Sequence, residues 1–114
     1  MKTVWIPGRF QPPHVGHKAM IDKALGEGAK VCVLVRDTDL DDDNPFTYKE
    51  RLDILREWYG DGVHICLIPD PDCELEIWAG RGVGWKYREV RLDPEVEEIS
   101  ATKIREGLRK AGVI

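Results

Sequence analysis

Two histidines flank a glycine near the start of the chain, in the segment His14-Val15-Gly16-His17. The three-residue spacing places both imidazoles on one face of a helix. The Gly- and Pro-rich segment 7–13 precedes them, so we expect them in the first helical turn, where unsatisfied N–H groups attract anions. Gly16 has no side chain and would let a phosphate approach the backbone. The segment therefore predicts a triphosphate site; the alternative is two surface histidines on an amphipathic helix.

A second group of anion-binding side chains lies near the other end of the chain, between Ile99 and Arg105. Ser100 is placed to cap a helix there, which is the commonest role of a serine at such a position. Thr102 and Arg105 share a helix face by their spacing. Hydroxyls, cations and a helix N-terminus together predict a second phosphate site, suited to the β- and γ-phosphates.

Together the two segments resemble the HxGH and ISSTxxR signatures of the cytidylyltransferase-like nucleotidyltransferase superfamily. The resemblance implies a Rossmann-like fold and a nucleoside triphosphate substrate bound with Mg²⁺. It further implies in-line attack by an acceptor phosphate on the α-phosphorus, release of pyrophosphate and no covalent enzyme intermediate. Catalysis in such an enzyme is chiefly positioning and charge neutralisation.

Carried onto this sequence, the resemblance gives His14, His17 and Arg105 the catalytic role. It gives the nucleotide-binding role to Gly8, Arg9, Phe10, Gly16, Lys18, Ser100 and Thr102. The chain departs from the usual signature at Ala101, where the family often has a second serine. One hydroxyl contact is then absent, but the neighbouring hydroxyls remain, and we still expect activity.

The first signature favours one branch of the superfamily. The segment from Gly8 to His17 is similar to the GRFQPxHxGH form of the archaeal-type nicotinamide-nucleotide adenylyltransferases. Residues 44–47, followed by Glu50-Arg51, are similar to the segment that leads into the second helix in that branch. The resemblance implies ATP as donor and nicotinamide mononucleotide as acceptor, and hence a role in NAD biosynthesis. A cytidylyltransferase acting on a small phosphorylated alcohol, or a nucleotide-binding regulatory module, is the alternative. The chain is much shorter than a typical adenylyltransferase of that branch.

Candidate acceptor contacts come from two places. Arg51 follows Glu50 on the predicted second helix, where it contacts phosphate or acceptor or pairs within the helix. Trp78, Arg81 and Trp85 lie in a segment rich in glycine, typical of a loop near a ligand. Either tryptophan is placed to stack on a nicotinamide or a base, or to join the core.

Alternating strands and helices are predicted to position these residues. Strands are expected at 4–6, 30–36 and 63–68, with weaker candidates at Glu74 to Ala79 and Tyr87 to Leu92. The middle strand lacks polar alternation, as in a parallel strand buried on both faces. Helices are expected from Val15 to Leu25, from Thr47 to Gly60 and from Ser100 to Gly112. In the second, Thr47 and Glu50 can form a capping box and Gly60 is the expected stop. The third is expected to bury Ala101, Ile104, Leu108 and Ala111.

This order predicts an α/β fold: a Rossmann-like, doubly wound parallel sheet of about five strands with flanking helices. The 114 residues fit a single domain, residues 1–114. Ligands of such folds bind at the carboxyl ends of the strands, where both signatures would meet. A domain of this size would gain stability by forming a homo-oligomer.

Composition narrows the class of protein further. The formal net charge is −4, so the surface as a whole does not attract nucleic acid, and the phosphate-binding cations must be concentrated in one pocket. No apolar run has membrane-spanning length, and the apolar start is too short for a signal peptide. Cys32, Cys66 and Cys73 match no metal-ligand spacing, and the first two lie in apolar runs as small hydrophobes. We expect a soluble, cytoplasmic protein with no resident metal. The acidic run 37–43 is interpreted as a solvated loop.

Overall fold

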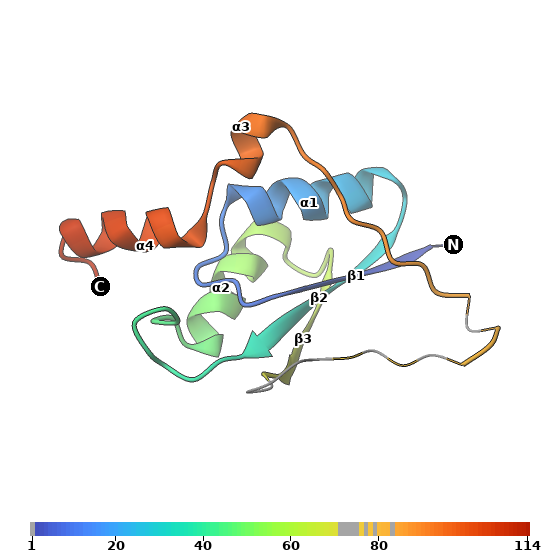
Figure 1. The fold of residues 1–114 in the computed structure, drawn as a ribbon, viewed down its shortest axis with the longest axis horizontal. Helices are drawn as coiled ribbons and strands as arrows, with labels where there is room; N and C mark the ends of the chain where they lie inside the picture. The colour runs from blue at the N-terminus through green and yellow to red at the C-terminus, as the bar shows by residue number, and fades with distance from the viewer. Residues whose placement is uncertain (1, 71–75, 77, 79, 83) are drawn as a thin grey trace.

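The computed structural model describes residues 2–70, 76, 78, 80–82 and 84–114. Its sheet has three parallel strands in the order β1-β2-β3: β1 (Thr3–Gly8), β2 (Lys30–Asp37) and β3 (His64–Pro69) (Figure 1). Cys32 of β2 is level with Trp5 of β1 and His64 of β3. The carboxyl ends of all three strands therefore lie at one edge of the sheet.

Local sequence signals define the two helices that connect the strands. Helix α1 (Val15–Gly26) begins after His14, whose side chain accepts a hydrogen bond from the helix backbone. Helix α2 (Tyr48–Tyr59) begins after Thr47, which forms the expected capping box with Glu50, and it ends at Gly60. Both capping boxes satisfy N–H groups that the first helical turn leaves free. The predicted positions of both helices are confirmed.

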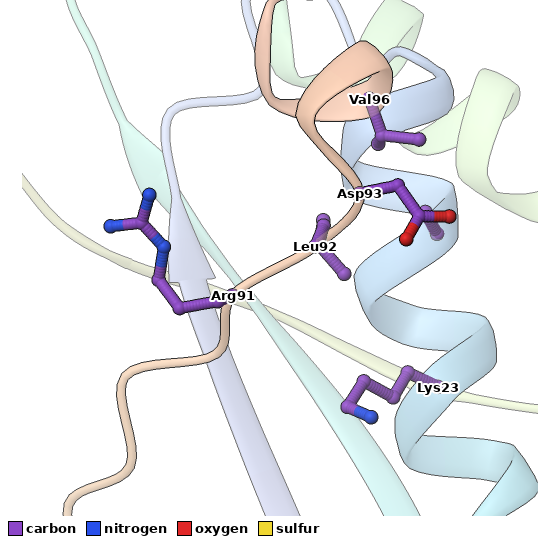
Figure 2. A pocket seen from close by; sticks show the side chains of 6 residues that line it. Lys23, Arg91, Leu92, Asp93 and Val96 are labelled. Atoms are coloured by element: carbon purple, nitrogen blue, oxygen red, sulfur yellow. The ribbon is translucent and has the colours of Figure 1, made fainter.

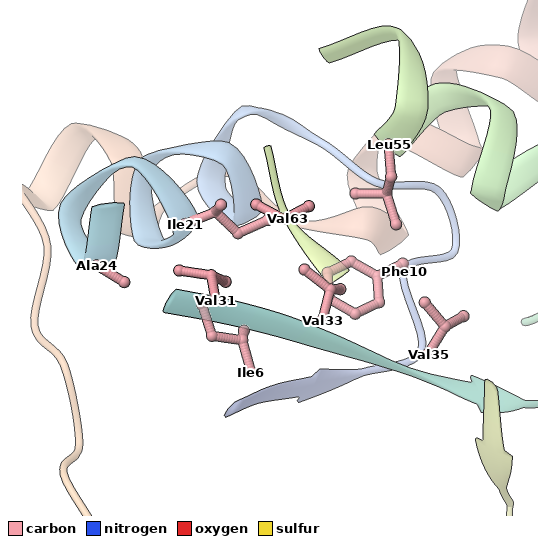
Figure 3. Close-up of a cluster of buried hydrophobic side chains, with 9 residues drawn as sticks. All are labelled: Ile6, Phe10, Ile21, Ala24, Val31, Val33, Val35, Leu55 and Val63. Atoms are coloured by element: carbon pink, nitrogen blue, oxygen red, sulfur yellow. The ribbon is translucent and has the colours of Figure 1, made fainter. Parts of the chain in front are cut away.

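The hydrophobic core lies between these helices and one face of the sheet (Figure 3). Alternate residues of β2, namely Val31, Val33 and Val35, are almost fully buried on that face. Ile21 and Ala24 of α1 and Leu55 of α2 pack against them, together with Ile6, Phe10 and Val63. Successive side chains of a strand point to opposite faces, so both helices cover the same face. The described part of the chain is a two-layer α/β unit.

The opposite face of the sheet is largely open. Trp5 is 58% exposed there, Cys66 is exposed and Cys32 is only partly buried. The expectation that both cysteines would serve as buried hydrophobes is therefore wrong for Cys66 and only partly right for Cys32. A helical layer on this face would have buried them, but the described helices lie elsewhere. Trp85 covers part of this face by packing edge-to-face on Trp5, with ring centroids 5.4 Å apart.

The Rossmann-like α/β class is confirmed, but the described residues contain three strands rather than about five. The candidate strand from Glu74 to Ala79 lies mostly outside the described residues. The candidate from Tyr87 to Leu92 forms no strand. Its polar groups bond elsewhere: the Arg88 side chain donates to Glu27, and the Leu92 N–H donates to Glu97.

Two further helices follow this segment. Helix α3 (Pro94–Glu97), which the sequence analysis did not predict, contacts α1, and its first residue is a proline. Helix α4 (Ala101–Lys110) begins at its cap Ser100, as predicted, and extends away from the sheet (Figure 1). Its predicted apolar face is only partly buried, and Ala111 is exposed, because little of the described chain packs against the end of this helix. The buried residue of α4 is Arg105.

Candidate active site

The two histidines form a stacked pair at the start of α1. Nδ1 of His14 accepts a hydrogen bond from the Gly16 N–H at 3.0 Å, and Nδ1 of His17 accepts one from the His14 N–H at 3.1 Å. The two ring centroids are 3.8 Å apart, and Phe10 packs on the other side of His17 at 4.5 Å. The rings are held by the backbone and by each other.

Both imidazoles present a hydrogen-bond donor. Nδ1 of each ring accepts a backbone N–H and so carries no proton, which leaves the proton of the neutral ring on Nε2. Burial lowers the pKa of His14. The pKa of His17 is lowered to about 3, mainly by burial and to a smaller extent by electrostatic repulsion from His14. At neutral pH the pair therefore offers two neutral Nε2–H groups at a helix N-terminus, suited to phosphate oxygens.

The lowered pKa of His17 predicts a loss of stability in mild acid. The unfolded chain binds a proton near pH 6.5 and the folded chain only near pH 3, so the free energy of unfolding falls as the pH falls through this window. Carboxylates such as Glu27, whose pKa is lowered from 4.5 to about 2 by Lys2 and Arg88, contribute mainly as the pH falls below about 4.5, and so overlap only the lower part of this window. We expect His17→Asn to flatten the pH dependence of urea unfolding between pH 6.5 and 4.5. An unchanged slope would contradict the assigned burial of the neutral ring.

Gly16 is required by the position of the His14 ring. A Cβ at this residue would lie 2.8 Å from Cε1 and 2.9 Å from Nδ1 of His14, closer than real Cβ contacts. Gly16→Ala must therefore turn the imidazole away and break its bond to the backbone, at a cost of about 1 kcal/mol in stability. Because the donor is displaced, turnover should fall at least about tenfold in a steady-state assay.

Gly107→Ala is the matched control for this substitution. A Cβ at Gly107 meets nothing within 4 Å, and alanine favours a helix over glycine by about 1 kcal/mol. We expect this variant to match the parent in turnover and to be slightly more stable. Equal turnover in the two variants would contradict the role assigned to Gly16.

Gln11 connects the β1–α1 loop to the loop after β2. Its side-chain amide donates to Thr38 Oγ1 at 3.0 Å and to the Phe46 carbonyl at 2.9 Å, and it accepts from the Phe46 N–H at 2.8 Å. Gln11 is 2% exposed, so these bonds are shielded from water. Gln11 was not among the predicted site residues. Its place in the first signature was a signal, but its partners lie 27 and 35 residues away in the sequence.

Arg51 reinforces the same connection and is buried, with 1% of its surface exposed. Its guanidinium donates to the carbonyls of Arg9 at 2.9 Å and Arg36 at 2.7 Å, and Nε donates to that of Thr47 at 3.2 Å. These bonds hold the first loop, the end of β2 and the start of α2 together. Arg51 was expected to contact phosphate or the acceptor, or else to pair within its helix. The hydrogen bonds found are with backbone carbonyls. Its role toward the acceptor stays a prediction.

Arg105 brings the second signature to the first. Its Nη1 donates to the Gln11 carbonyl at 2.7 Å, across 94 residues of sequence, and its Nη2 lies 3.4 Å from Thr102 Oγ1. Ser100 caps α4 by accepting from the Lys103 N–H. The start of α4 and the loop before α1 therefore meet beyond the carboxyl ends of the strands, where the sequence analysis expected the ligand.

The remaining nucleotide-binding candidates surround the loop. Phe10 is buried with φ +52°, a strained conformation for a bulky residue, and a Cβ at Gly8 would lie 3.0 Å from the Phe10 ring. Arg9 is exposed, with Nη1 3.5 Å from the Asn44 side chain. Lys18 pairs with Asp22 at 2.9 Å and so is engaged on the side of α1.

The acceptor candidates of the Gly-rich segment lie outside this cluster. Trp78 is 87% exposed and donates to Glu76, and Arg81 is also exposed. Trp85 packs on Trp5, on the face of the sheet opposite the helices. The structure therefore does not bring these three side chains to the histidines, and their acceptor role stays a prediction.

Two open cavities lie on the described part of the chain, and only the second includes a candidate site residue. One, of about 400 Å³, lies between α1 and the segment that leads into α3 (Figure 2). Its lining includes the basic residues Lys23 and Arg91 and the acidic residue Asp93. The other, of about 370 Å³, borders the start of α4, with Ser100 and Lys103 in its wall. The second cavity therefore adjoins the second signature, whereas neither histidine lines the first.

Among the described residues, no three His, Cys, Asp or Glu side chains gather as metal ligands. In the same part of the chain, no helix is long and apolar enough to cross a membrane.

Comparison with known proteins agrees with this geometry. The sequence model of the cytidylyltransferase-like family matches residues 5–77, which include most of β1, all of β2 and β3, both covering helices and the histidine pair. The chain therefore belongs to the cytidylyltransferase-like family.

Within that family, several curated relatives are named nicotinamide-nucleotide adenylyltransferase. That of Pyrobaculum neutrophilum is 40% identical over 88 residues, covering 71% of this chain and 49% of the relative. That of Aeropyrum pernix is 43% identical over 88 residues, covering 68% and 49%. The chain spans about half the length of the curated relatives it matches.

Proposed function

We propose that this protein is an adenylyltransferase that transfers AMP from ATP to nicotinamide mononucleotide and releases pyrophosphate, forming NAD. The observation that carries the proposal is the bond between Arg105 and the Gln11 carbonyl, which joins the two signature segments at one edge of the sheet. The names of the relatives support the choice of nucleotide and acceptor.

Residues at the starts of α1 and α4 would bind different parts of the triphosphate. The Nε2–H groups of His14 and His17 would donate to oxygens of the phosphate chain at the α1 N-terminus, where the helix dipole also favours negative charge. Arg105 and Thr102 would bind the β- and γ-phosphates from α4. As charge moves onto the leaving pyrophosphate, these fixed donors stabilise it without having to reorganise.

No side chain needs to act as a nucleophile in this scheme. The acceptor phosphate attacks the α-phosphorus in line, its oxygen forms the new P–O bond, and the bond to the β-phosphate oxygen breaks. A Mg²⁺ ion bound with the triphosphate would supply further neutralisation of the phosphate charges. The protein would contribute chiefly alignment of the two substrates.

The Gln11-Pro12-Pro13 form of the first signature predicts a preference for ATP over CTP. The test is pyrophosphate release with either nucleotide and a panel of phosphorylated acceptors that includes nicotinamide mononucleotide. We expect release with ATP and this acceptor to exceed release with CTP and any acceptor. Equal or faster release with CTP would place the protein among cytidylyltransferases, and binding of both nucleotides without release would indicate a regulatory module.

A further inference from the structure

Gln11 is held on two sides by residues that lie far away in the sequence. Its side-chain amide donates to Thr38 Oγ1 and to the Phe46 carbonyl, and it accepts from the Phe46 N–H, all within 3.0 Å. Its own backbone carbonyl accepts from Nη1 of Arg105 at 2.7 Å. This one residue therefore connects the loop before α1 both to the loop after β2 and to α4.

The side chain of Gln11 complements the backbone of Phe46. A carboxamide presents one acceptor and one donor side by side, which match the N–H and the carbonyl of a single residue. A carboxylate would lack the donor that faces the Phe46 carbonyl. The second N–H of the amide is used by Thr38, and Gln11 is 2% exposed. The amide therefore has no donor left for a substrate.

The loop that Gln11 holds also contacts basic side chains at the candidate site. Asn44, in this loop, accepts from Nη1 of Arg9 at 3.5 Å, and Arg9 is a predicted nucleotide contact. The Asp42 carbonyl accepts from Arg109 of α4. Asn44 is 8% exposed, so packing fixes its place in the loop. A shift of the loop relative to Gln11 would disturb both contacts.

We propose that Gln11 is a positioning residue for the adenylyl transfer proposed above, on which this inference rests. Its amide aligns the two phosphate-binding helix starts without touching a substrate. Pro12 and Pro13, whose rings fix the backbone φ angle, connect Gln11 to His14, so a displacement of Gln11 passes to the histidine pair. The same displacement moves the carbonyl that holds Arg105. Misplacement of reacting groups by about 1 Å can lower a rate by about a hundredfold.

The test compares steady-state pyrophosphate release, with ATP and nicotinamide mononucleotide, in the parent and in Gln11→Met. Methionine keeps the unbranched shape of glutamine but has neither its amide donors nor its amide oxygen. We expect kcat to fall at least about tenfold while the KM for ATP changes by less than about threefold, as for a residue that acts on alignment alone.

Thr38 supplies a second and milder variant of the same junction. Thr38→Val removes one of the three side-chain bonds of Gln11 and should lower kcat by about two- to fivefold. Thr38→Ser keeps the hydroxyl and should retain parental kcat. In the Gln11→Met background, Thr38→Val should add less than it costs alone, because the shared bond is already absent. These variants carry the test if Gln11→Met does not fold.

Val31→Ala is the control for lost stability, because Val31 is 2% exposed in the core, at the end of β2 opposite this junction. It should unfold at a lower temperature than the parent and keep parental kcat while folded. A Gln11→Met protein that behaves in the same way would assign Gln11 to the fold alone. A raised KM with unchanged kcat would mean that Gln11 contacts substrate. Either result overturns the proposal.

The ring ¹⁵N signals of His14 and His17 give a readout that requires no turnover. Saturating ATP should shift the Nε2 signals of both rings in the parent and shift them less in Gln11→Met. Equal shifts in the two proteins would overturn the positioning role. The proposed function fails on a different result, namely a parent that binds ATP but releases no pyrophosphate with nicotinamide mononucleotide.

Discussion

Replacing His17 with alanine is expected to lower turnover with ATP and nicotinamide mononucleotide by at least about a hundredfold, the usual scale for removing one preorganised donor to a developing charge. The expectation rests on the Nε2–H that the buried neutral ring presents while its Nδ1 accepts the His14 N–H. Steady-state kinetics of pyrophosphate release measures the effect.

The fold should survive this substitution. The variant loses one half of the α1 capping box and the stacking on Phe10, which we expect to cost about 1–2 kcal/mol in stability. Val15→Ala is the matched control, because Val15 belongs to the same helical turn and is 57% exposed. The control should keep parental turnover. Near-parental turnover in folded His17→Ala would show that the phosphate-site assignment is wrong.

Replacing Arg105 with alanine is expected to weaken ATP binding far more than AMP binding. The proposed contacts of Arg105 are with the β- and γ-phosphates, which AMP lacks, and charge-assisted bonds of this kind contribute about 1.5–3 kcal/mol. We therefore expect ATP affinity to fall by about ten- to a hundredfold while AMP affinity changes little. Isothermal titration of both nucleotides against parent and variant measures the difference.

Arg105 also has a structural role that this experiment must separate. The side chain is 5% exposed and donates to the Gln11 carbonyl, so its removal also loosens the junction of the two signature segments. Arg109→Ala is the control, since Arg109 lies one turn further along α4, is exposed and bonds to the Asp42 carbonyl. An equal loss of ATP and AMP affinity in Arg105→Ala would mean that Arg105 only supports the fold.

Features governed by neighbouring residues were predictable from the sequence. The capping box of Thr47 and Glu50, the cap Ser100 and the stop at Gly60 involve groups within one helical turn, and all three are confirmed. The parallel strands followed from the apolar run of β2. The convergence of the two signatures followed from the rule that parallel strands end at one edge, and the bond from Arg105 to Gln11 agrees with it.

Features that depend on distant partners were not predictable. Gln11 and Arg51 form buried bonds with loops up to 42 residues away, many of them to backbone groups, which carry no sequence signal. The apolar pattern of Tyr87 to Leu92 resembles a strand, but no neighbouring strand pairs with it in the described chain. The exposure of Cys66 has the same origin, because an apolar run does not show whether a second layer covers the sheet.

The most direct test of a single triphosphate site is ¹⁵N NMR of the histidine rings, since the chain has three histidines and His64 lies on the open face of the sheet. At neutral pH, His14 and His17 should both appear as Nε2–H tautomers, and saturating ATP should shift both Nε2 signals while that of His64 stays in place. AMP should cause smaller shifts. Unchanged His14 and His17 signals at saturating ATP would contradict the account.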